Sequence, residues 1–319
     1  MSDSARADKP AGLPPRKSGL AKVFDSDLWH SFIRSKVTVL AAIVTFIIVF
    51  CSMFAPWVAP HNPFDLASLS LLDSLTPPAW EEWGNPSYLL GTDDQGRDML
   101  SAILYGTRIS LIIGLASVAF AAVLGITLGL IAGYVGGATD SIIMRIADVQ
   151  LTFPAILIAL LIDGTARGLF PGMGREEMAY YVLVLSLGLS FWVQYARTVR
   201  GSTLVEANKE YVLAGKMIGL PTFIIMLRHV LPNVLGPVLV IATINLALAI
   251  ITEATLSFLG VGVPPTQPSL GTLIRVGQDY LFSGEWWIAM FPSAMLAILV
   301  LAVNLLGDWL RDALNPKLR

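Results

Sequence analysis

Six long apolar runs, each separated from the next by a polar segment, set the pattern of the chain. They cover residues 37–58, 109–134, 142–162, 178–195, 236–260 and 286–306. A helix of about 20 apolar residues is long enough to cross the hydrocarbon core of a bilayer. The pattern therefore predicts an all-α integral membrane protein with six transmembrane helices.

The first apolar run follows a basic, proline-containing segment, residues 1–36. A basic segment ahead of an apolar run is also typical of a cleaved signal peptide. This run is too long for a typical signal peptide, and Ala55-Pro56-Trp57 is a poor cleavage site. We therefore expect an uncleaved first helix over residues 37–58 and, before it, a polar tail with a helical stretch near Asp27–Arg34.

The composition agrees with a membrane protein and excludes several other classes. Of the 319 residues, 55% are hydrophobic and 14% are charged, whereas soluble domains carry about 25% charged residues. The net charge is −2, so the chain has no basic surface of the kind that binds nucleic acid. The lone Cys51 cannot form an internal disulfide, and the three histidines do not have the spacing of metal ligands.

Motifs for ATP binding and for catalysis are absent from the sequence. Gly215-Lys216 is the only Gly-Lys pair, and Glu210 and Met217 stand where a phosphate-binding loop needs Gly and Ser or Thr. HExxH and GxSxG sequences do not occur. If transport by this protein is active, its energy must come from another chain or from an ion gradient.

The distribution of positive charge predicts the orientation in the membrane. With the N-terminus in the cytoplasm, 16 of the 21 Lys and Arg residues lie in inner segments and five in outer ones. The positive-inside rule favours this arrangement, with both termini cytoplasmic. It places residues 197–235 inside and residues 59–107 outside.

Residues 200–233 form the longest polar-interrupted stretch in the second half of the chain. Apolar residues within it recur at spacings of three and four, which predicts one face of a helix: Leu204, Ala207, Tyr211, Ala214 and Ile218. We expect this helix to end at Gly219-Leu220-Pro221, and a second short helix, capped by Thr222, to run to Pro232. The loop is either a solvated linker or a docking surface for a soluble partner; an apolar stripe favours docking.

The polar segment 59–107 is rich in proline and ends in the sequence GTDDQGRD at residues 91–98. Thr92 or Asp93 is placed to cap a helix that leads into the second span. The acidic residues faintly resemble a calcium-binding loop, but Gln95 and the lack of a distal Glu argue against one. We predict no metal site here.

Two features inside the spans are candidates for function. Gly125, Gly129 and Gly133 form a double GxxxG in the second span, which allows close packing either within this chain or against a partner. Asn245 and Glu253 are polar residues of the fifth span. An acid within a span is a candidate for lining a substrate path, and the alternative is structural hydrogen bonding.

Four segments resemble signatures of bacterial ABC-importer permeases, more narrowly the permease C type of the dipeptide, oligopeptide and nickel branch. They are YVLAGKMIG at 211–219 with RHVLPN at 228–233, GTDDQGRD at 91–98 with YGTRISL at 105–111, EATLSFLG at 253–260, and GDWLRDALNP at 307–316. The chain departs from the family pattern at Leu213, Gly215, His229 and Asn315.

The resemblance implies a type I ABC importer permease fold in the bacterial inner membrane. Its parts would be a cytoplasmic tail (1–36), a first transmembrane helix (37–58), a periplasmic segment (59–107), a five-helix permease core (108–307) with a cytoplasmic coupling loop (197–235), and a cytoplasmic C-terminal tail (308–319). Its partners would be a second, homologous permease subunit, two ATP-binding subunits that hold ATP and Mg, and a periplasmic substrate-binding protein. The chain itself would need no cofactor and would import di- or oligopeptides.

The resemblance also assigns roles to particular residues. The ATPase-coupling residues would be Leu204, Tyr211, Ala214, Gly215, Ile218, Gly219, Pro221, Arg228, His229 and Pro232. The periplasmic signature would be Gly91, Thr92, Asp93, Asp94, Gly96, Arg97 and Asp98. Since Glu253 belongs to a signature shared across substrates, the resemblance favours a structural role for it.

The sequence is also compatible with two other functions. A self-contained secondary transporter or channel would need ionisable groups at the middle of the membrane, where Glu253 is the one candidate. An intramembrane enzyme would need a nucleophile with a base, or a metal set, and the sequence shows neither.

Overall fold

The computed structural model of the chain describes residues 27–65, 69–170, 172 and 174–314. Residues 1–26 of the expected N-terminal tail and 315–319 of the C-terminal tail, with Asn315, lie outside these ranges. The longest helices are α3 (Lys36–Met53), α5 (Met99–Val135), α8 (Arg175–Glu206), α11 (Leu231–Phe258) and α13 (Trp287–Leu314). The shorter elements are α2 (Asp27–Arg34), α4 (Ala55–Val58), the 3-10 turn η1 (Leu71–Asp73), α6 (Gly137–Gln150), α7 (Ala155–Leu169), α9 (Glu210–Met217), α10 (Thr222–Ile224), the π-helix η2 (Ile225–Val230) and α12 (Leu270–Tyr280).

The number of membrane spans agrees with the prediction. Five helical segments of the described residues are long and apolar enough to cross a membrane, and α6 with α7 makes a sixth if the two count as one span. The expected helix near Asp27–Arg34 is present as α2. The described part of the fold is therefore an all-α bundle of five continuous candidate spans and one bent pair.

The third span is bent, which corrects the single helix expected over residues 142–162. α6 and α7 meet at 93° across a break that ends at Pro154. Proline has no N–H to donate to the helix ladder and pushes the residue before it out of the helical region. Pro154 itself has an extended ψ of 143° and is the N-cap residue of α7.

Other helices are longer than the apolar runs that predicted them. α5 begins at Met99, where the side chain of Asp98 accepts a hydrogen bond from the Ser101 N–H at 3.0 Å. Asp98 is therefore the cap, and the expectation of Thr92 or Asp93 was wrong. α12 was not predicted from the sequence, although Ser269 caps it by accepting from the Thr272 N–H.

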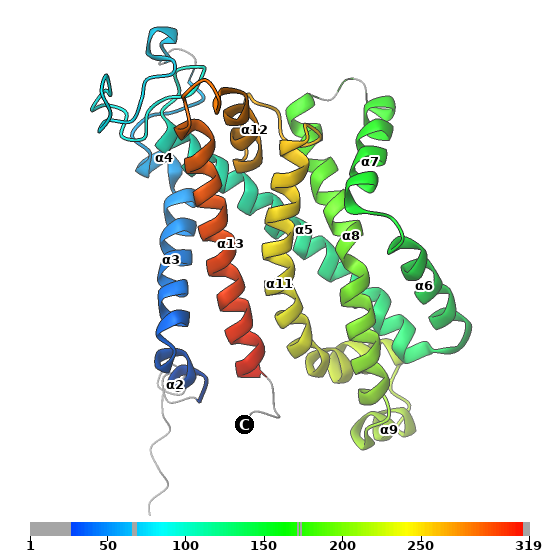
Figure 1. The fold of residues 1–319 in the computed structure, drawn as a ribbon. Helices are drawn as coiled ribbons and strands as arrows, with labels where there is room; N and C mark the ends of the chain where they lie inside the picture. The colour runs from blue at the N-terminus through cyan, green and yellow to red at the C-terminus, as the bar shows by residue number, and fades with distance from the viewer. Residues whose placement is uncertain (1–26, 66–68, 171, 173, 315–319) are drawn as a thin grey trace, which may run out of the picture.

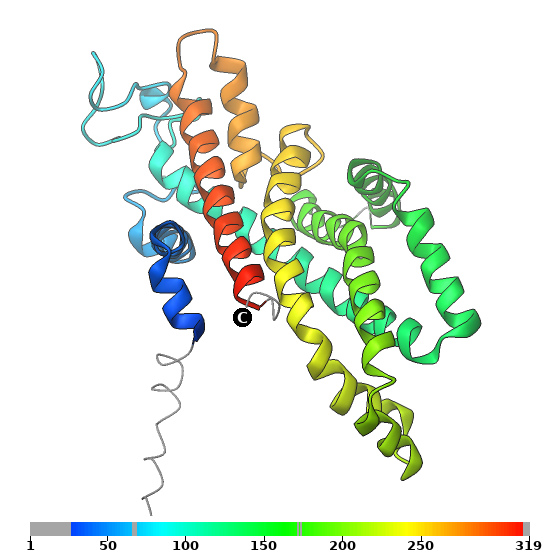
Figure 2. The ribbon, with the colours of Figure 1, turned by 60° about the horizontal axis from the view of Figure 1, so that its bottom comes forward.

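The bundle is organised around α5, which packs along α8, with α11 beside both (Figure 1). Ile113, Leu187, Val193 and Val199 are fully buried where these helices meet. On the other side, α3 lies against α13 and α5. α12 and residues 69–98 lie at one end of the bundle, and α2, α9 and the last turn of α13 lie at the other (Figures 1 and 2).

Candidate functional site

The end of α9 is built as the sequence predicted. Gly219 has φ +77°, a conformation that glycine adopts without steric cost. Its N–H donates to the carbonyl of Lys216, and the Leu220 N–H donates to the carbonyl of Gly215, both at 3.1 Å. These two bonds form a Schellman motif, which closes the helix and turns the chain back toward the bundle.

The continuous helix predicted from Leu204 to Ile218 is wrong. α8 runs from within the membrane to Glu206, the chain turns at Ala207-Asn208, and α9 starts again at Glu210. Leu204 and Ile218 therefore do not share one helix face. A spacing of three and four cannot show such a break, because Ala207 and Asn208 fit a helix as well as a turn.

The predicted second short helix is also not separate. Thr222 is the first residue of α10 and Pro221 precedes it, with no side-chain cap. α10 continues through the π-helix η2 into α11, and Pro232 lies in the first turn of α11. Pro232 has no N–H to donate, but the helical segment continues through it.

A polar network fixes α9 to the neighbouring helices. The Tyr211 hydroxyl donates to the Glu206 carboxylate and accepts from the Asn233 amide at 2.9 Å. Lys209 pairs with Glu206 at 2.8 Å, and Asn233 also donates to the His229 carbonyl. Burial raises the pKa of Tyr211, and its bond to Glu206 raises it further. The sequence analysis missed Glu206 and Asn233, since neither lies on the apolar stripe.

Apolar side chains remain exposed at the tip of this segment. Val212 and Gly215 face inward and are buried. Four large apolar residues face outward, and we call them the α9 surface: Leu213 (44% exposed), Met217 (88%), Ile218 (75%) and Phe223 (68%). Exposed apolar groups gathered in one place indicate an interaction site.

The other predicted coupling residues differ in how exposed their side chains are. Leu204 and Tyr211 are each 40% exposed. Ala214, Gly219, Pro221, Arg228 and Pro232 are exposed, His229 is half-buried and Gly215 is buried. Gly215 therefore lies on the buried side of α9, near Leu220 and Ile225.

The GTDDQGRD segment is a buried scaffold at the opposite end of the bundle. Asp93 accepts from the backbone N–H groups of Gln95 and Arg97, both at 2.9 Å, and from Arg97 Nε at 2.6 Å. Gly91 and Gly96 have φ of +78° and +75°, so both turns require glycine. Arg97 is 2% exposed, and its Nη1 donates to the carbonyl of Pro265 at 2.9 Å.

This scaffold joins three parts of the chain. Arg97 connects it to the loop after α11, and Trp287 of α13 donates to the Thr92 carbonyl at 3.0 Å. Burial raises the pKa of Asp94, and the Asp93 carboxylate raises it further, while Arg97 opposes both. Among the described residues, no three His, Cys, Asp or Glu side chains gather so as to hold a metal ion.

The glycine stripe of α5 is used for packing inside the chain. A side chain at Gly125 would overlap Tyr195 and the Trp192 carbonyl of α8. Gly129 and Gly133 lie equally close to α8 further along. Of the two interpretations of the double GxxxG, close packing against another helix of the same chain is the one observed.

The two polar residues of the fifth span are both fully buried. Glu253 accepts hydrogen bonds from Ser110 of α5 and from Ser257 of α11, both at 2.7 Å. These two bonds link α5 to α11. Asn245 is buried close to Tyr195 of α8.

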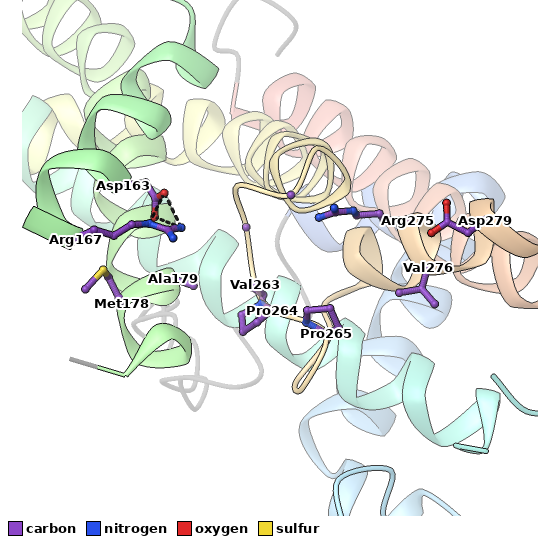
Figure 3. A pocket seen from close by; sticks show the side chains of 12 residues that line it. Asp163, Arg167, Met178, Ala179, Val263, Pro264, Pro265, Arg275, Val276 and Asp279 are labelled. Carbon is purple, nitrogen blue, oxygen red and sulfur yellow. Dashed lines mark hydrogen bonds and ion pairs between the residues drawn. The ribbon is translucent and has the colours of Figure 1, made fainter. Parts of the chain in front are cut away.

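A cleft of about 420 Å³ opens at the α12 end (Figure 3). We call it the α12 cleft. It is lined by Asp163 and Arg167 of α7, Met178 and Ala179 of α8, Gly260, Gly262, Val263, Pro264 and Pro265 of the loop after α11, and Arg275, Val276 and Asp279 of α12. No sequence motif marks it, because its residues come from four separate segments.

Comparisons with known proteins agree with this architecture. Residues 125–319 match the family model described as binding-protein-dependent transport system inner membrane component. Residues 26–78 match the N-terminal transmembrane domain of oligopeptide transport permease C.

Relatives of similar length exist in several bacteria. The chain is 40% identical over 293 residues to the di/tripeptide transport system permease protein of Pseudomonas aeruginosa, covering 92% of each chain. It is 40% identical to the dipeptide permease protein of Escherichia coli K12, covering 92% of this chain and 93% of that one. The oligopeptide permease protein of Bacillus subtilis is 36% identical, with 92% and 90% covered.

Solved structures share the fold at low sequence identity. A chain of the MetNI methionine ABC transporter, in inward-facing conformations, aligns with a TM-score of 0.53 at 18% identity. The alignment covers 68% of this chain and 98% of that one. This likeness concerns the arrangement of the helices alone.

Proposed function

The chain belongs to the family of binding-protein-dependent transport system inner membrane components, and on that premise we propose that it forms half of the translocation path of an ATP-driven peptide importer. It is a multi-pass protein of the bacterial inner membrane. Its relatives at 36–40% identity are named as dipeptide, di/tripeptide and oligopeptide permeases. Those names support di- and oligopeptides as the substrate class of this chain.

The α9 surface is the observation that carries the coupling role. It presents Leu213, Met217, Ile218 and Phe223 to solvent at the end of the bundle opposite the α12 cleft. A pure linker would gain nothing from exposing them, whereas a groove on a soluble subunit would bury them. We assign this surface to the contact with an ATP-binding subunit in the cytoplasm.

The proposed assembly is the one that membership of this family implies. The chain has no phosphate-binding loop, so ATP and Mg would be held by two partner subunits. A second permease subunit would form the other half of the path. A periplasmic substrate-binding protein would deliver peptides at the α12 end.

A pull-down in mild detergent tests this assignment. The tagged chain is purified from its native membrane, and the proteins that accompany it are identified by mass spectrometry. Recovery of one or two phosphate-loop ATPases with a second permease supports the proposal. Recovery of the chain alone, in a preparation that still transports peptides, would support a secondary transporter instead.

A further inference from the structure

The α12 cleft contains four charged side chains, of which two are already paired. Arg167 lies 2.7 Å from Asp163 in an ion pair along α7. Arg275 and Asp279 of α12 are both exposed. Within the ranges that the structure describes, neither makes a hydrogen bond or an ion pair with another side chain. The cleft therefore offers one unpaired cation and one unpaired anion.

These two charges stand apart although they are one helical turn from each other. Residues at this spacing have Cβ atoms about 5–6 Å apart, near enough to pair. Instead, the Arg275 guanidinium is turned toward the backbone of Gly260, and the Asp279 carboxylate points away from it (Figure 3). Two separated opposite charges suit a ligand that carries both charges itself.

Part of the cleft lining is apolar, and one loop of it is held in place. Met178, Val263 and Val276 line the cleft beside the Pro264-Pro265 pair. The hydrogen bond from buried Arg97 to the Pro265 carbonyl fixes this loop to the GTDDQGRD scaffold. Gly260, with φ +86°, leaves room for the Arg275 guanidinium, which any side chain at this position would displace. The cleft is thus formed before a ligand arrives.

We propose that the α12 cleft is a subsite for the charged termini of a short peptide, with Arg275 on the α-carboxylate and Asp279 on the α-ammonium. The termini of an extended dipeptide lie at most about 7 Å apart, so a short peptide carries its two opposite charges close together, as this helix does. The volume of the cleft lies within the range of about 300–1,000 Å³ for small-ligand pockets. The apolar lining residues Met178, Val263 and Val276 would accept peptide side chains of different kinds. This inference rests on the proposed function.

Thiol protection in the assembled transporter measures occupancy directly. In a Cys51→Ser background, Val276→Cys places one thiol in the cleft, and its rate of modification by a water-soluble thiol reagent is followed without ATP or binding protein. Ala-Ala at ten times its dissociation constant should slow modification about tenfold. Arg275→Gln should raise the concentration needed for half-protection by about tenfold or more, the loss of one charge-assisted bond.

Three controls make the result specific. Phe282→Cys lies after α12 at a position that is 96% exposed and outside the cleft, so Ala-Ala should not protect it. N-acetyl-Ala-Ala-amide has no charged termini and should not protect Val276→Cys. Gln278→Ala changes an exposed residue of α12 that does not line the cleft, and should leave protection unchanged.

Several outcomes would overturn the subsite. No protection by Ala-Ala, equal protection by the blocked peptide, or protection only when the binding protein is added would each do so, the last indicating a protein-docking surface. Failure of the proposed function would look different, since the wild-type assembly would then not import peptides at all. The thiol measurement does not depend on transport, so the two failures can be told apart.

Discussion

At the level of single residues, Glu253 separates an ATP-coupled permease from a transporter driven by protons. A proton-coupling acid must exchange with water, but this carboxylate is fully buried between Ser110 and Ser257. Its bonds join α5 to α11, and we expect it to hold the two spans in register rather than to carry protons.

We therefore expect Glu253→Gln to retain peptide uptake, because the amide oxygen still accepts a serine hydrogen bond. Glu253→Leu removes the acceptor of both buried serine O–H groups and should lower the free energy of unfolding by about 1–3 kcal/mol. Thermal melting in detergent and uptake assays measure both variants. Loss of uptake in Glu253→Gln with unchanged melting would point to proton coupling.

The glycine stripe of α5 predicts a second effect. In Gly129→Ala the new methyl group would lie about 2.9 Å from Val199 Cβ and closer still to the Ala196 carbonyl. Overpacking of this kind costs about 1–3 kcal/mol, which should appear as a lower melting temperature. Gly201→Ala is the matched control on α8, where nothing lies within 4 Å. Equal melting of the two variants would contradict the close α5–α8 packing.

Asp94 gives the GTDDQGRD scaffold a pH dependence. Burial and Asp93 raise its pKa in the folded chain above the ordinary 3.8, so the folded state binds the proton more tightly. This group then favours folding most below pH 3.8, and the contribution is lost as the pH rises through the folded pKa. Asp94→Asn cannot ionise, so it should be slightly more stable than wild type at pH 7, by less than about 1 kcal/mol after solvent screening. Melting curves should converge in acid; a difference independent of pH would refute this.

At the level of elements, α9 depends on the turn at Gly219. Gly219→Val must hold a β-branched residue at φ +77°, at a cost of about 1–2 kcal/mol. We expect this variant to reach the membrane but to lose most ATP-dependent uptake, because the α9 surface is no longer held in place. Gly219→Asn is the control, since Asn tolerates this conformation and nothing lies within 4 Å of the site. Equal uptake by the two variants would show that the turn does not matter.

The sequence predicted the spans and the end of α9, because apolar length and the Gly-x-Pro turn are local signals. It did not predict the bend at Pro154 or the break between α8 and α9. The apolar spacing continues through the bend and through the break, so it does not reveal either of them. The contacts that hold α9 in place, such as those of Tyr211 with Glu206 and Asn233, form only in the packed structure. The α12 cleft was missed for the same reason, since its charges become neighbours only in the fold.

At the level of the whole molecule, the two candidate sites lie at opposite ends and share one helical segment. Residues Thr222–Phe258 run from the turn after α9, through the π-helix, to the loop that lines the α12 cleft. The π-helix lies at the α9 end, and such turns are frequent at functional sites. We therefore expect a displacement of α9 by a bound partner to reach the cleft through one continuous helical segment.

Cross-linking from the α9 surface tests the central claim most directly. In the Cys51→Ser background, Ile218→Cys is treated with a short thiol-to-amine cross-linker in native membranes, and the product is identified by mass spectrometry. The coupling role predicts a cross-link to a phosphate-loop ATPase, and none from Phe282→Cys at the α12 end. An Ile218→Cys chain that imports peptides yet cross-links to no ATPase would contradict it.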